Sequence, residues 1–451
     1  MSDFQRKTVK GPVKLVQIHS SGRCMAIHDE KNVFMDNGIP GEEVLFTTQR
    51  RKLGFRTGSI ARILLPSKFR IYPYCIHSKE CGGCPWQHIE YSNQLTLKSE
   101  ILVNALKKYN IPFTDIPKVI PSPMLHFYRH RMEYSFSAPD ILGFHSSEDS
   151  KSVNDILECY LQPRMSRAIC EFIKAYSYSR SVEYYDAQAD SGFLRSLSIR
   201  INKDGQIMLV LGLHRDDPGL REKLMTDLMK KFKQIVSLNY TVHLSPRHSQ
   251  LHGEICTFKG TQPYIMETSG EFKFRIHASS FFQPNVAQAG NIFQTIREWA
   301  QAGKNDKVVD LYTGVGTIAH YLAKDAGHVT GIEGSAQAIE DARANAEMNN
   351  LKNTHFIQGD ILKTFTTGFL RENGSPDLIV LDPPRSGTLI EIKKTINASG
   401  ARKVIYLSCN PVSLAFDLKQ LTEVYHITRI QPFDMLPHTH HLETVVMLER
   451  K

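Results

Sequence analysis

Two side chains near the C-terminal end of the sequence have the chemistry of a nucleophile and a base. Cys409 follows the apolar run Val404–Ser408 and comes just before Pro411, which indicates a buried strand that ends at a cysteine. Glu443 comes directly before another largely apolar run, Thr444–Leu448. A thiolate can bond covalently to a substrate carbon, and a carboxylate can then accept a proton. The alternatives are a small buried cysteine and a solvated strand end.

Four other cysteines have a spacing that suits metal ligands. Three lie close together and the fourth follows much later: Cys75, Cys81, Cys84 and Cys159. Four soft thiolates close either a tetrahedral zinc site or a cubane iron–sulfur cluster, and the spacing does not separate the two. Unligated cysteines are the alternative. The polar start and the lack of a long apolar run predict a cytoplasmic protein without a membrane segment, in which thiols stay reduced.

A glycine-containing turn between a strand and a helix predicts a site for a nucleotide-like ligand. Residues 307–317 form an apolar strand followed by a turn that contains Gly314 and Gly316. Glycines let the backbone approach a ligand closely, and the N-terminus of the next helix favours negative groups. Glu333 ends the next strand, 23 residues after Asp310, where a carboxylate can accept hydrogen bonds from both hydroxyls of a ribose.

The order of the motifs that follow separates two classes of ligand. A third apolar strand ends at Asp360, and a fourth ends at Asp382, which two prolines follow. A dinucleotide-binding site has a third glycine where Ala319 stands, and it has no place for Asp-Pro-Pro. The ordered set instead resembles the class I methyltransferase fold and its S-adenosylmethionine site. Arg385 stands where amino-methylating enzymes usually have an aromatic residue, which points away from an exocyclic nitrogen as the methyl acceptor.

The elements that must position these residues change character along the chain. Residues 8–70 alternate apolar and polar positions between turns, which predicts a small β-barrel. A helix is expected over residues 92–108, and after residue 285 strands and helices alternate as in a parallel α/β sheet. The predicted fold class is therefore multidomain α/β, with a barrel over 1–70, a central α+β unit over 71–280 and a doubly wound, Rossmann-like unit over 281–451.

Most of the net charge lies in the predicted barrel. Residues 1–70 hold 13 basic and 6 acidic side chains, a net of +7 out of +9 for the whole chain. A polyphosphate such as RNA is the natural partner of this module, and a merely solvated surface is the alternative. The basic residues of its last third are Arg50, Arg51, Lys52, Arg56, Arg62, Lys68 and Arg70.

Three motifs in the C-terminal part together resemble those of the RNA 5-methyluridine methyltransferase family. They are Asp382-Pro-Pro-Arg-Ser-Gly, Tyr406-Leu-Ser-Cys-Asn-Pro and His441-Leu-Glu443, and the resemblance extends over nearly the whole chain. The family covers bacterial 23S ribosomal RNA enzymes and the tRNA enzyme that acts on the T loop. The resemblance implies that Cys409 adds to carbon 6 of a uracil, which activates carbon 5 for methylation. It also implies that Glu443 then accepts the proton from carbon 5.

The same resemblance implies a set of residues for the methyl donor, S-adenosylmethionine. Asp360 is expected near the adenine, and Thr317 stands where many members have Asn. The expected donor residues are Gln283, Tyr312, Gly314, Gly316, Thr317, Glu333, Asp360 and Asp382.

The cysteine-rich segment and the barrel imply the substrate. Cys81-Gly-Gly-Cys84, with Gln87 and His88 soon after, looks like the ribosomal branch of the family, in which a structural [4Fe–4S] cluster lies near the RNA. The barrel looks like a TRAM domain. We therefore expect a uridine of 23S ribosomal RNA as the substrate and no obligate protein partner. The alternatives are a tRNA T-loop uridine, a cytidine, a radical S-adenosylmethionine reaction and a noncatalytic RNA-binding factor.

Overall fold

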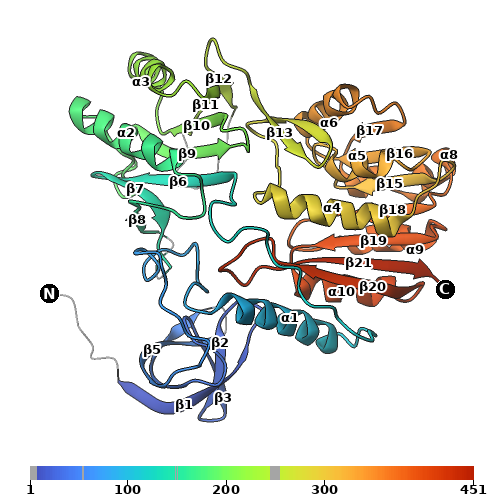
Figure 1. Ribbon diagram of the computed structural model, residues 1–451, viewed down its shortest axis with the longest axis horizontal. Coiled ribbons are helices and arrows are strands. Elements are labelled where there is room, and N and C mark those ends of the chain that lie inside the picture. The colour runs from blue at the N-terminus through green and yellow to red at the C-terminus, as the bar shows by residue number, and fades with distance from the viewer. Residues whose placement is uncertain (1–7, 53–54, 148, 150, 244–253) are drawn as a thin grey trace.

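The computed structural model describes residues 8–52, 55–147, 149, 151–243 and 254–451. It has three parts, which Figure 1 shows as a blue barrel, a central green sheet and a C-terminal yellow-to-red sheet. The expected α/β fold with a small N-terminal barrel is therefore confirmed. Within the described part of the chain, no helix is long and apolar enough to cross a membrane.

The N-terminal part is a closed five-stranded barrel, as the alternating pattern predicts. Its strands follow the order β1-β2-β3-β5-β4 around the barrel. Leu15, Ala26 and Phe46 are fully buried in its core. The strands are β1 (Val9–Ile18), β2 (Cys24–His28), β3 (Lys31–Met35), β4 (Glu43–Lys52) and β5 (Phe55–Leu65).

One of the basic residues expected on the RNA-binding surface of the barrel, Arg70, is paired inside the fold. The side chains of Arg50, Arg51 and Lys52 lie outside the described residues. Arg70 forms an ion pair with the buried Glu42 carboxylate, with its Nε 2.6 Å from Oε1, and it also donates to the carbonyl of Asn37. Its charge is therefore used inside the fold. The sequence showed only that the basic stretch itself holds no acidic residue, and the partner, Glu42, lies outside that stretch.

Helix α1 (Tyr91–Lys108) confirms the predicted helix and joins the barrel to the C-terminal part. Leu97 and Ile101 belong to the hydrophobic core of the barrel. Leu102 and Leu106, further along the helix, belong to a core on one face of the C-terminal sheet. The two ends of one helix thus bury apolar side chains in two different domains.

The central part is a seven-stranded sheet, ordered β12-β11-β10-β9-β6-β7-β8. Its strands pair antiparallel except β10 and β11, which are parallel because helix α3 connects them. The strands are β6 (Arg131–Ser137), β7 (Ile141–His145), β8 (Val153–Asp155), β9 (Leu194–Ile201), β10 (Ile207–Leu213), β11 (Ile235–Val242) and β12 (Cys256–Thr257). The helices are α2 (Met165–Arg180) and α3 (Pro218–Lys231).

The C-terminal part contains a seven-stranded sheet that is parallel except for β21. Its order is β17-β16-β15-β18-β19-β21-β20. The strands are β15 (Lys307–Leu311), β16 (His328–Glu333), β17 (Thr354–Gln358), β18 (Leu378–Leu381), β19 (Lys403–Ser408), β20 (Tyr425–Phe433) and β21 (Glu443–Arg450). All four residues of β18 are buried, as expected for a strand covered on both faces.

Helices cover both faces of this sheet. The order of strands and helices predicted after residue 285 is confirmed. The helices are α4 (Val286–Ala300), α5 (Thr317–Ala323), α6 (Ala336–Met348), α7 (Ile361–Thr364), α8 (Thr367–Asn373), α9 (Ile390–Ala398) and α10 (Pro411–Leu421). A separate hairpin, β13 (Tyr264–Ser269) and β14 (Phe272–His277), packs Phe272, Phe274 and Ile276 into the core on the α4 face.

Candidate active site

The carboxyl ends of three parallel strands meet at one edge of the C-terminal sheet. Leu311 pairs with Leu381, and Leu381 pairs with Tyr406. The residues that follow these strands therefore lie at the same edge, which is where ligands bind in open α/β sheets. Tyr312 follows β15 directly, Asp382 follows β18, and Cys409 follows β19.

The antiparallel strand β21 brings Glu443 to the same edge as Cys409. Ser408 pairs with Thr444 across β19 and β21, so that Cys409, after Ser408, lies opposite Glu443, before Thr444. Pro411 ends the strand as expected, and it does so by starting a helix: Asn410 caps α10, with its Oδ1 accepting from the N–H of Val412 at 3.0 Å. The strand and the cap together fix the backbone on both sides of the cysteine.

Burial and neighbouring charges control the ionisation of both residues. Burial raises the pKa of the Cys409 thiol to about 12, and the carboxylates of Glu443 and Asp382 add to this rise. Burial also raises the pKa of Glu443 to about 7, and the Arg385 guanidinium partly opposes this. A carboxyl group with this pKa can both accept and release a proton near neutral pH.

Arg385 is a site residue whose role the sequence analysis missed. Its positive charge lowers the pKa of both Cys409 and Glu443. Its Nη2 lies 2.6 Å from Nδ1 of His441, and its carbonyl accepts from the side chain of Asn410 at 2.9 Å. From the sequence alone, Arg385 indicated only that a stacking aromatic residue is absent. A cation directly after Asp-Pro-Pro was the available signal, because acidic strand ends need a counter-charge.

The glycine turn, Glu333 and Asp360 lie at a neighbouring part of the same edge. Gly314 donates its N–H to Oε2 of Glu333 at 3.3 Å, and Gly359 donates to the Glu333 carbonyl at 2.9 Å. Gly314 has a φ of +57°, and a Cβ placed there would meet open space within 4 Å. Asp360 caps α7 by accepting from the N–H of Lys363 at 3.3 Å. A carboxylate beside the open position at Gly314 fits a ribose and the group attached to it.

Three further expected donor residues lie on different elements of the fold: Tyr312, Thr317 and Gln283. The Tyr312 hydroxyl lies 2.9 Å from Oγ1 of Thr388, which fixes the ring beside the strand ends. Thr317 is the first residue of α5, directly after the glycine turn. Gln283 lies in the segment between β14 and α4.

Asp310 is a second residue whose role the sequence analysis missed. Its side chain is fully buried, and its Oδ2 accepts from the Thr313 hydroxyl at 2.5 Å. Burial raises its pKa to about 7, and the carboxylate of Glu333 adds to the rise. Asp310 served only as a spacing marker in the sequence. Its contact with Thr313 means that, from strand β15, it supports the loop that carries Gly314.

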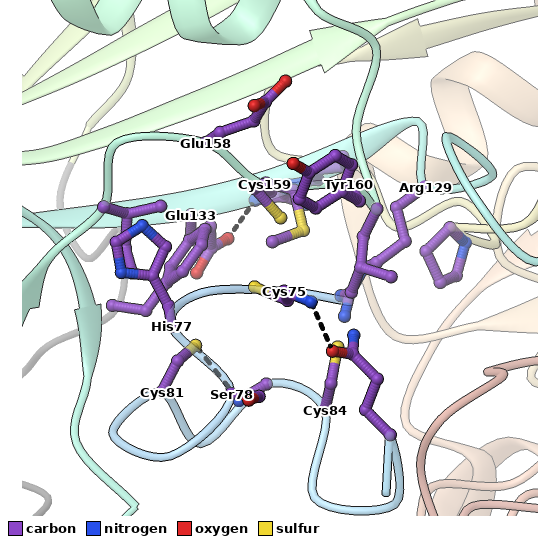
Figure 2. Close-up of a pocket in the computed structure, with 18 of the residues that line it drawn as sticks. Cys75, His77, Ser78, Cys81, Cys84, Arg129, Glu133, Glu158, Cys159 and Tyr160 are labelled. Carbon is purple, nitrogen blue, oxygen red and sulfur yellow. Dashed lines mark hydrogen bonds and ion pairs between the residues drawn. The ribbon is translucent and has the colours of Figure 1, made fainter. Parts of the chain in front are cut away.

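The four expected metal cysteines line one cavity, which lies at the central sheet (Figure 2). The cavity has a volume of about 470 Å³, and its walls include Phe281, Phe282 and Pro284, the neighbours of Gln283. Burial raises the pKa of the Cys159 thiol to about 11 and raises those of Cys75, Cys81 and Cys84. Within the described residues, however, no group of three or more Cys, His, Asp or Glu side chains is arranged to hold a metal ion.

Comparisons with known proteins agree with this geometry. The model of the family described as tRNA (uracil-5-)-methyltransferase matches residues 90–451. An uncharacterized RNA methyltransferase of Porphyromonas gingivalis is 34% identical over 97% of this chain and 99% of its own length. A second one, from Thermotoga maritima, is 32% identical over 97% of this chain and 98% of its own length.

A solved structure is similar over nearly the whole chain. It is the tRNA (uracil-54, C5)-methyltransferase of Pyrococcus abyssi in complex with S-adenosyl-L-homocysteine, with a TM-score of 0.79 and 26% identity. The match covers 97% of this chain and 99% of the other. Together with the family match, this likeness shows that the chain belongs to the RNA uracil-5-methyltransferase family and is an S-adenosylmethionine-dependent RNA methyltransferase.

Proposed function

We propose that this enzyme methylates carbon 5 of a uridine in 23S ribosomal RNA, with Cys409 as the nucleophile and Glu443 as the base. The observation that carries the chemical part of the proposal is the register of β19 and β21, which sets Cys409 opposite Glu443 at the sheet edge. Arg385 faces both groups as a cation. A thiol and a carboxyl of pKa about 7 can serve as the nucleophile and the base that covalent activation of a pyrimidine requires.

The bond changes can be assigned to these side chains. Once deprotonated, Cys409 forms a bond from its sulfur to carbon 6 of the uracil, and the electron pair displaced from the ring makes carbon 5 nucleophilic. S-adenosylmethionine, when bound, supplies an electrophilic methyl group. After carbon 5 has gained the methyl, the Glu443 carboxylate accepts the proton from carbon 5. The electrons of that bond restore the ring double bond as the carbon–sulfur bond breaks, and Cys409 leaves as the thiolate.

The donor site is proposed at the glycine turn. Glu333 would accept hydrogen bonds from the ribose, and the open space at Gly314 leaves room for the ligand beside the backbone. Asp382 stands between this turn and Cys409, because β18 lies between β15 and β19 in the sheet. The full proposed set is Gln283, Tyr312, Gly314, Gly316, Thr317, Glu333, Asp360 and Asp382.

The cysteine cavity is proposed to hold a [4Fe–4S] cluster. The donor set fits, since four thiols line one largely apolar cavity and thiolates are the ligands of such clusters. Protein purified without oxygen should then be brown and contain iron and sulfide, and Cys159→Ser should lose both the colour and the iron. Colourless protein that contains zinc would contradict the proposal.

The barrel and the cysteine segment are the reasons for proposing a ribosomal substrate. One observation favours a second candidate, a T-loop uridine of tRNA. The Pyrococcus abyssi protein is a tRNA (uracil-54, C5)-methyltransferase, and the match covers 97% of the present chain, so the three-part architecture does not separate the two RNAs. Mass-spectrometric mapping of ribosomal and transfer RNA from cells lacking the protein decides between them. Loss of 5-methyluridine from 23S RNA is expected, and a loss confined to tRNA would overturn the substrate proposal.

Trapping with a modified RNA tests the mechanism itself. Fluorine at carbon 5 cannot leave as a proton, so 5-fluorouridine RNA plus the methyl donor should give a denaturation-resistant protein–RNA adduct. Cys409→Ala should give none, and Cys256→Ala is a matched control that changes a cysteine outside both proposed sites. If the wild type forms no adduct, or if Cys409→Ala still forms it, the covalent mechanism is wrong.

A further inference from the structure

The segment that joins β20 to β21 begins and ends beside the proposed base. Phe433, the last residue of β20, pairs directly with Glu443, the first residue of β21. Residues 434–442, here named the base loop, therefore leave and re-enter the sheet at the same place. Asp434 is the first residue of this loop and is bonded to the cross-strand partner of Glu443. Any contact that fixes Asp434 thus acts one residue away from the pair that holds Glu443.

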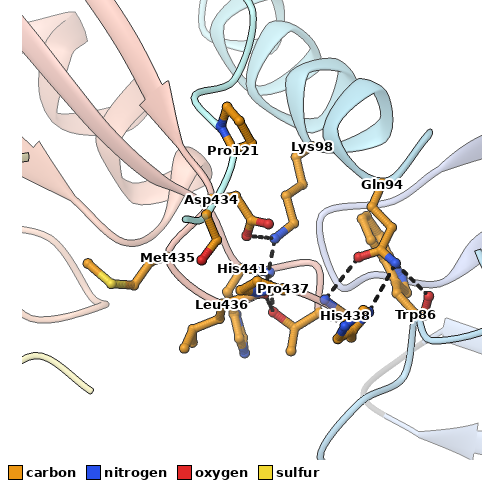
Figure 3. Close-up of polar contacts among 12 residues, drawn as sticks. Trp86, Gln94, Lys98, Pro121, Asp434, Met435, Leu436, Pro437, His438 and His441 are labelled. Carbon is orange, nitrogen blue, oxygen red and sulfur yellow. Dashed lines mark hydrogen bonds and ion pairs between the residues drawn. The ribbon is translucent and has the colours of Figure 1, made fainter. Parts of the chain in front are cut away.

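One face of helix α1 is built to hold the base loop (Figure 3). Tyr91, Gln94 and Lys98 follow one another at intervals of three and four residues, so their side chains lie along one stripe of the helix. The Tyr91 hydroxyl donates to Oδ2 of Asp434 at 2.8 Å. Lys98 forms an ion pair with the other oxygen of Asp434 and also donates to the carbonyl of Leu436 at 3.1 Å.

The middle of the base loop is held by the same helix. The backbone N–H of His438 donates to Oε1 of Gln94 at 2.9 Å. His438 has a φ of +65°, a left-handed conformation that is uncommon for a residue with a side chain. The contact with Gln94 helps to hold the backbone of the loop in this conformation.

The far end of the base loop reaches the reactive groups. His441 lies two residues before Glu443 and places its Nδ1 2.6 Å from Nη2 of Arg385. Arg385 is the cation that lowers the pKa of both Cys409 and Glu443. The loop thus leads directly into the backbone of the proposed base and carries a contact to its counter-charge.

The Lys98–Asp434 pair is not a natural choice for stability alone. Both side chains are completely buried, and such a pair gives up most of the hydration of two charges. Apolar residues of similar volume often stabilise a fold as well or better. What the pair provides is direction, because the ammonium group binds both the Asp434 carboxylate and the Leu436 carbonyl and so orients two residues of the loop.

We infer that Lys98 and Asp434 are positioning residues for the proposed base: they fix the base loop so that the Glu443 carboxylate reaches the proton on carbon 5. This inference rests on the proposed function. It predicts a specific defect, in which removal of the carbon 5 proton slows while bond formation by Cys409 does not. The methylated protein–RNA adduct should then accumulate on ordinary uridine RNA, where the wild type resolves it.

The test compares two reactions of the variant Lys98→Met/Asp434→Asn, which removes both charges and keeps the acceptor for Tyr91. With 5-fluorouridine RNA, adduct formation reports the steps before proton removal, and its rate should stay near that of the wild type. With ordinary uridine RNA, adduct resolution should slow by about 100-fold, the loss expected for a misplacement of about 1 Å. Quenched single-turnover reactions on denaturing gels measure both. Equal slowing of both reactions would overturn the inference.

Two controls separate the possible causes. Arg70→Met/Glu42→Gln removes another ion pair with a fully buried carboxylate, 2.6 Å apart, which lies in the barrel and outside the base loop. It should not accumulate adduct on ordinary RNA, and if it does, the effect reflects general loosening and the inference is wrong. Glu443→Gln should accumulate adduct most strongly. If Glu443→Gln gives no adduct, the proposed function fails rather than the role of Lys98 and Asp434.

Discussion

The substitution Glu443→Gln should make the protein more stable as it makes it inactive. The carboxyl is only 9% exposed, and burial raises its pKa from 4.5 to about 7. Because this pKa is higher in the folded than in the unfolded chain, the folded state binds more protons between these two values, and stability falls as the pH rises through that window. Glutamine does not ionise, so the variant avoids the loss.

The size of the effect follows from the pKa difference. A rise from 4.5 to about 7 corresponds to about 3 kcal/mol at pH 8, at about 1.4 kcal/mol for each pKa unit. We expect the free energy of unfolding of Glu443→Gln to exceed that of the wild type by about this amount at pH 8. At pH 4, where the buried carboxyl is protonated, the two proteins should be equally stable.

Urea-induced unfolding of the ligand-free proteins at several pH values between these limits measures the difference. Glu372→Gln is a matched control, since Glu372 is exposed on α8 of the same domain, and it should show no such pH dependence. A variant that is no more stable than the wild type at pH 8, or a difference that does not change with pH, would refute the claim that Glu443 is held against its own charge.

Three further predictions address the rest of the site. Arg385→Gln removes the charge that lowers the pKa of Glu443, so the acid limb of the single-turnover rate should move to a pH above about 7; Arg402→Gln, at the opposite end of the sheet, should leave the limb in place. Gly314→Ala puts a Cβ into open space at a φ of +57°, so calorimetry should show at least a tenfold weaker affinity for the methyl donor, about 1.4 kcal/mol. The donor is a cation and its demethylated product is neutral, so the affinity for the donor alone should rise as the pH passes about 7, where buried Asp310 ionises.

The sequence could predict the parts of the site that local pattern and motif order determine. Continuous apolar runs mark β18 and β19 as buried strands, and parallel strands gather their carboxyl ends at one edge, so Asp382 and Cys409 could be placed together without coordinates. Glu443 could be assigned a role through the family resemblance. Its position opposite Cys409 depends on β21 running antiparallel between β19 and β20, which no local pattern encodes.

Contacts between distant segments could not be predicted. Lys98 lies on a predicted helix, where a lysine normally faces solvent, and its partner Asp434 is 336 residues away in the sequence. Arg70 was assigned to an RNA-facing surface because the acidic partner, Glu42, lies on another part of the barrel. In both cases the residue type was known and the pairing was not, and pairing decides whether a charge is available to a ligand.

The electrostatics of the strand ends explain how the site can keep a reactive cysteine at rest. With a pKa of about 12, the Cys409 thiol carries very little thiolate at neutral pH, and thiolate is the form that attacks carbon and is oxidised. Carboxyl groups at 382 and 443 contribute to that pKa, so anything that neutralises or offsets their charge makes the thiolate easier to form. Arg385 already does so in part. In the proposed site, a cationic methyl donor bound near these carboxyl groups would offset their charge. Cys409 would then gain reactivity when the donor binds and lose it when the neutral product remains.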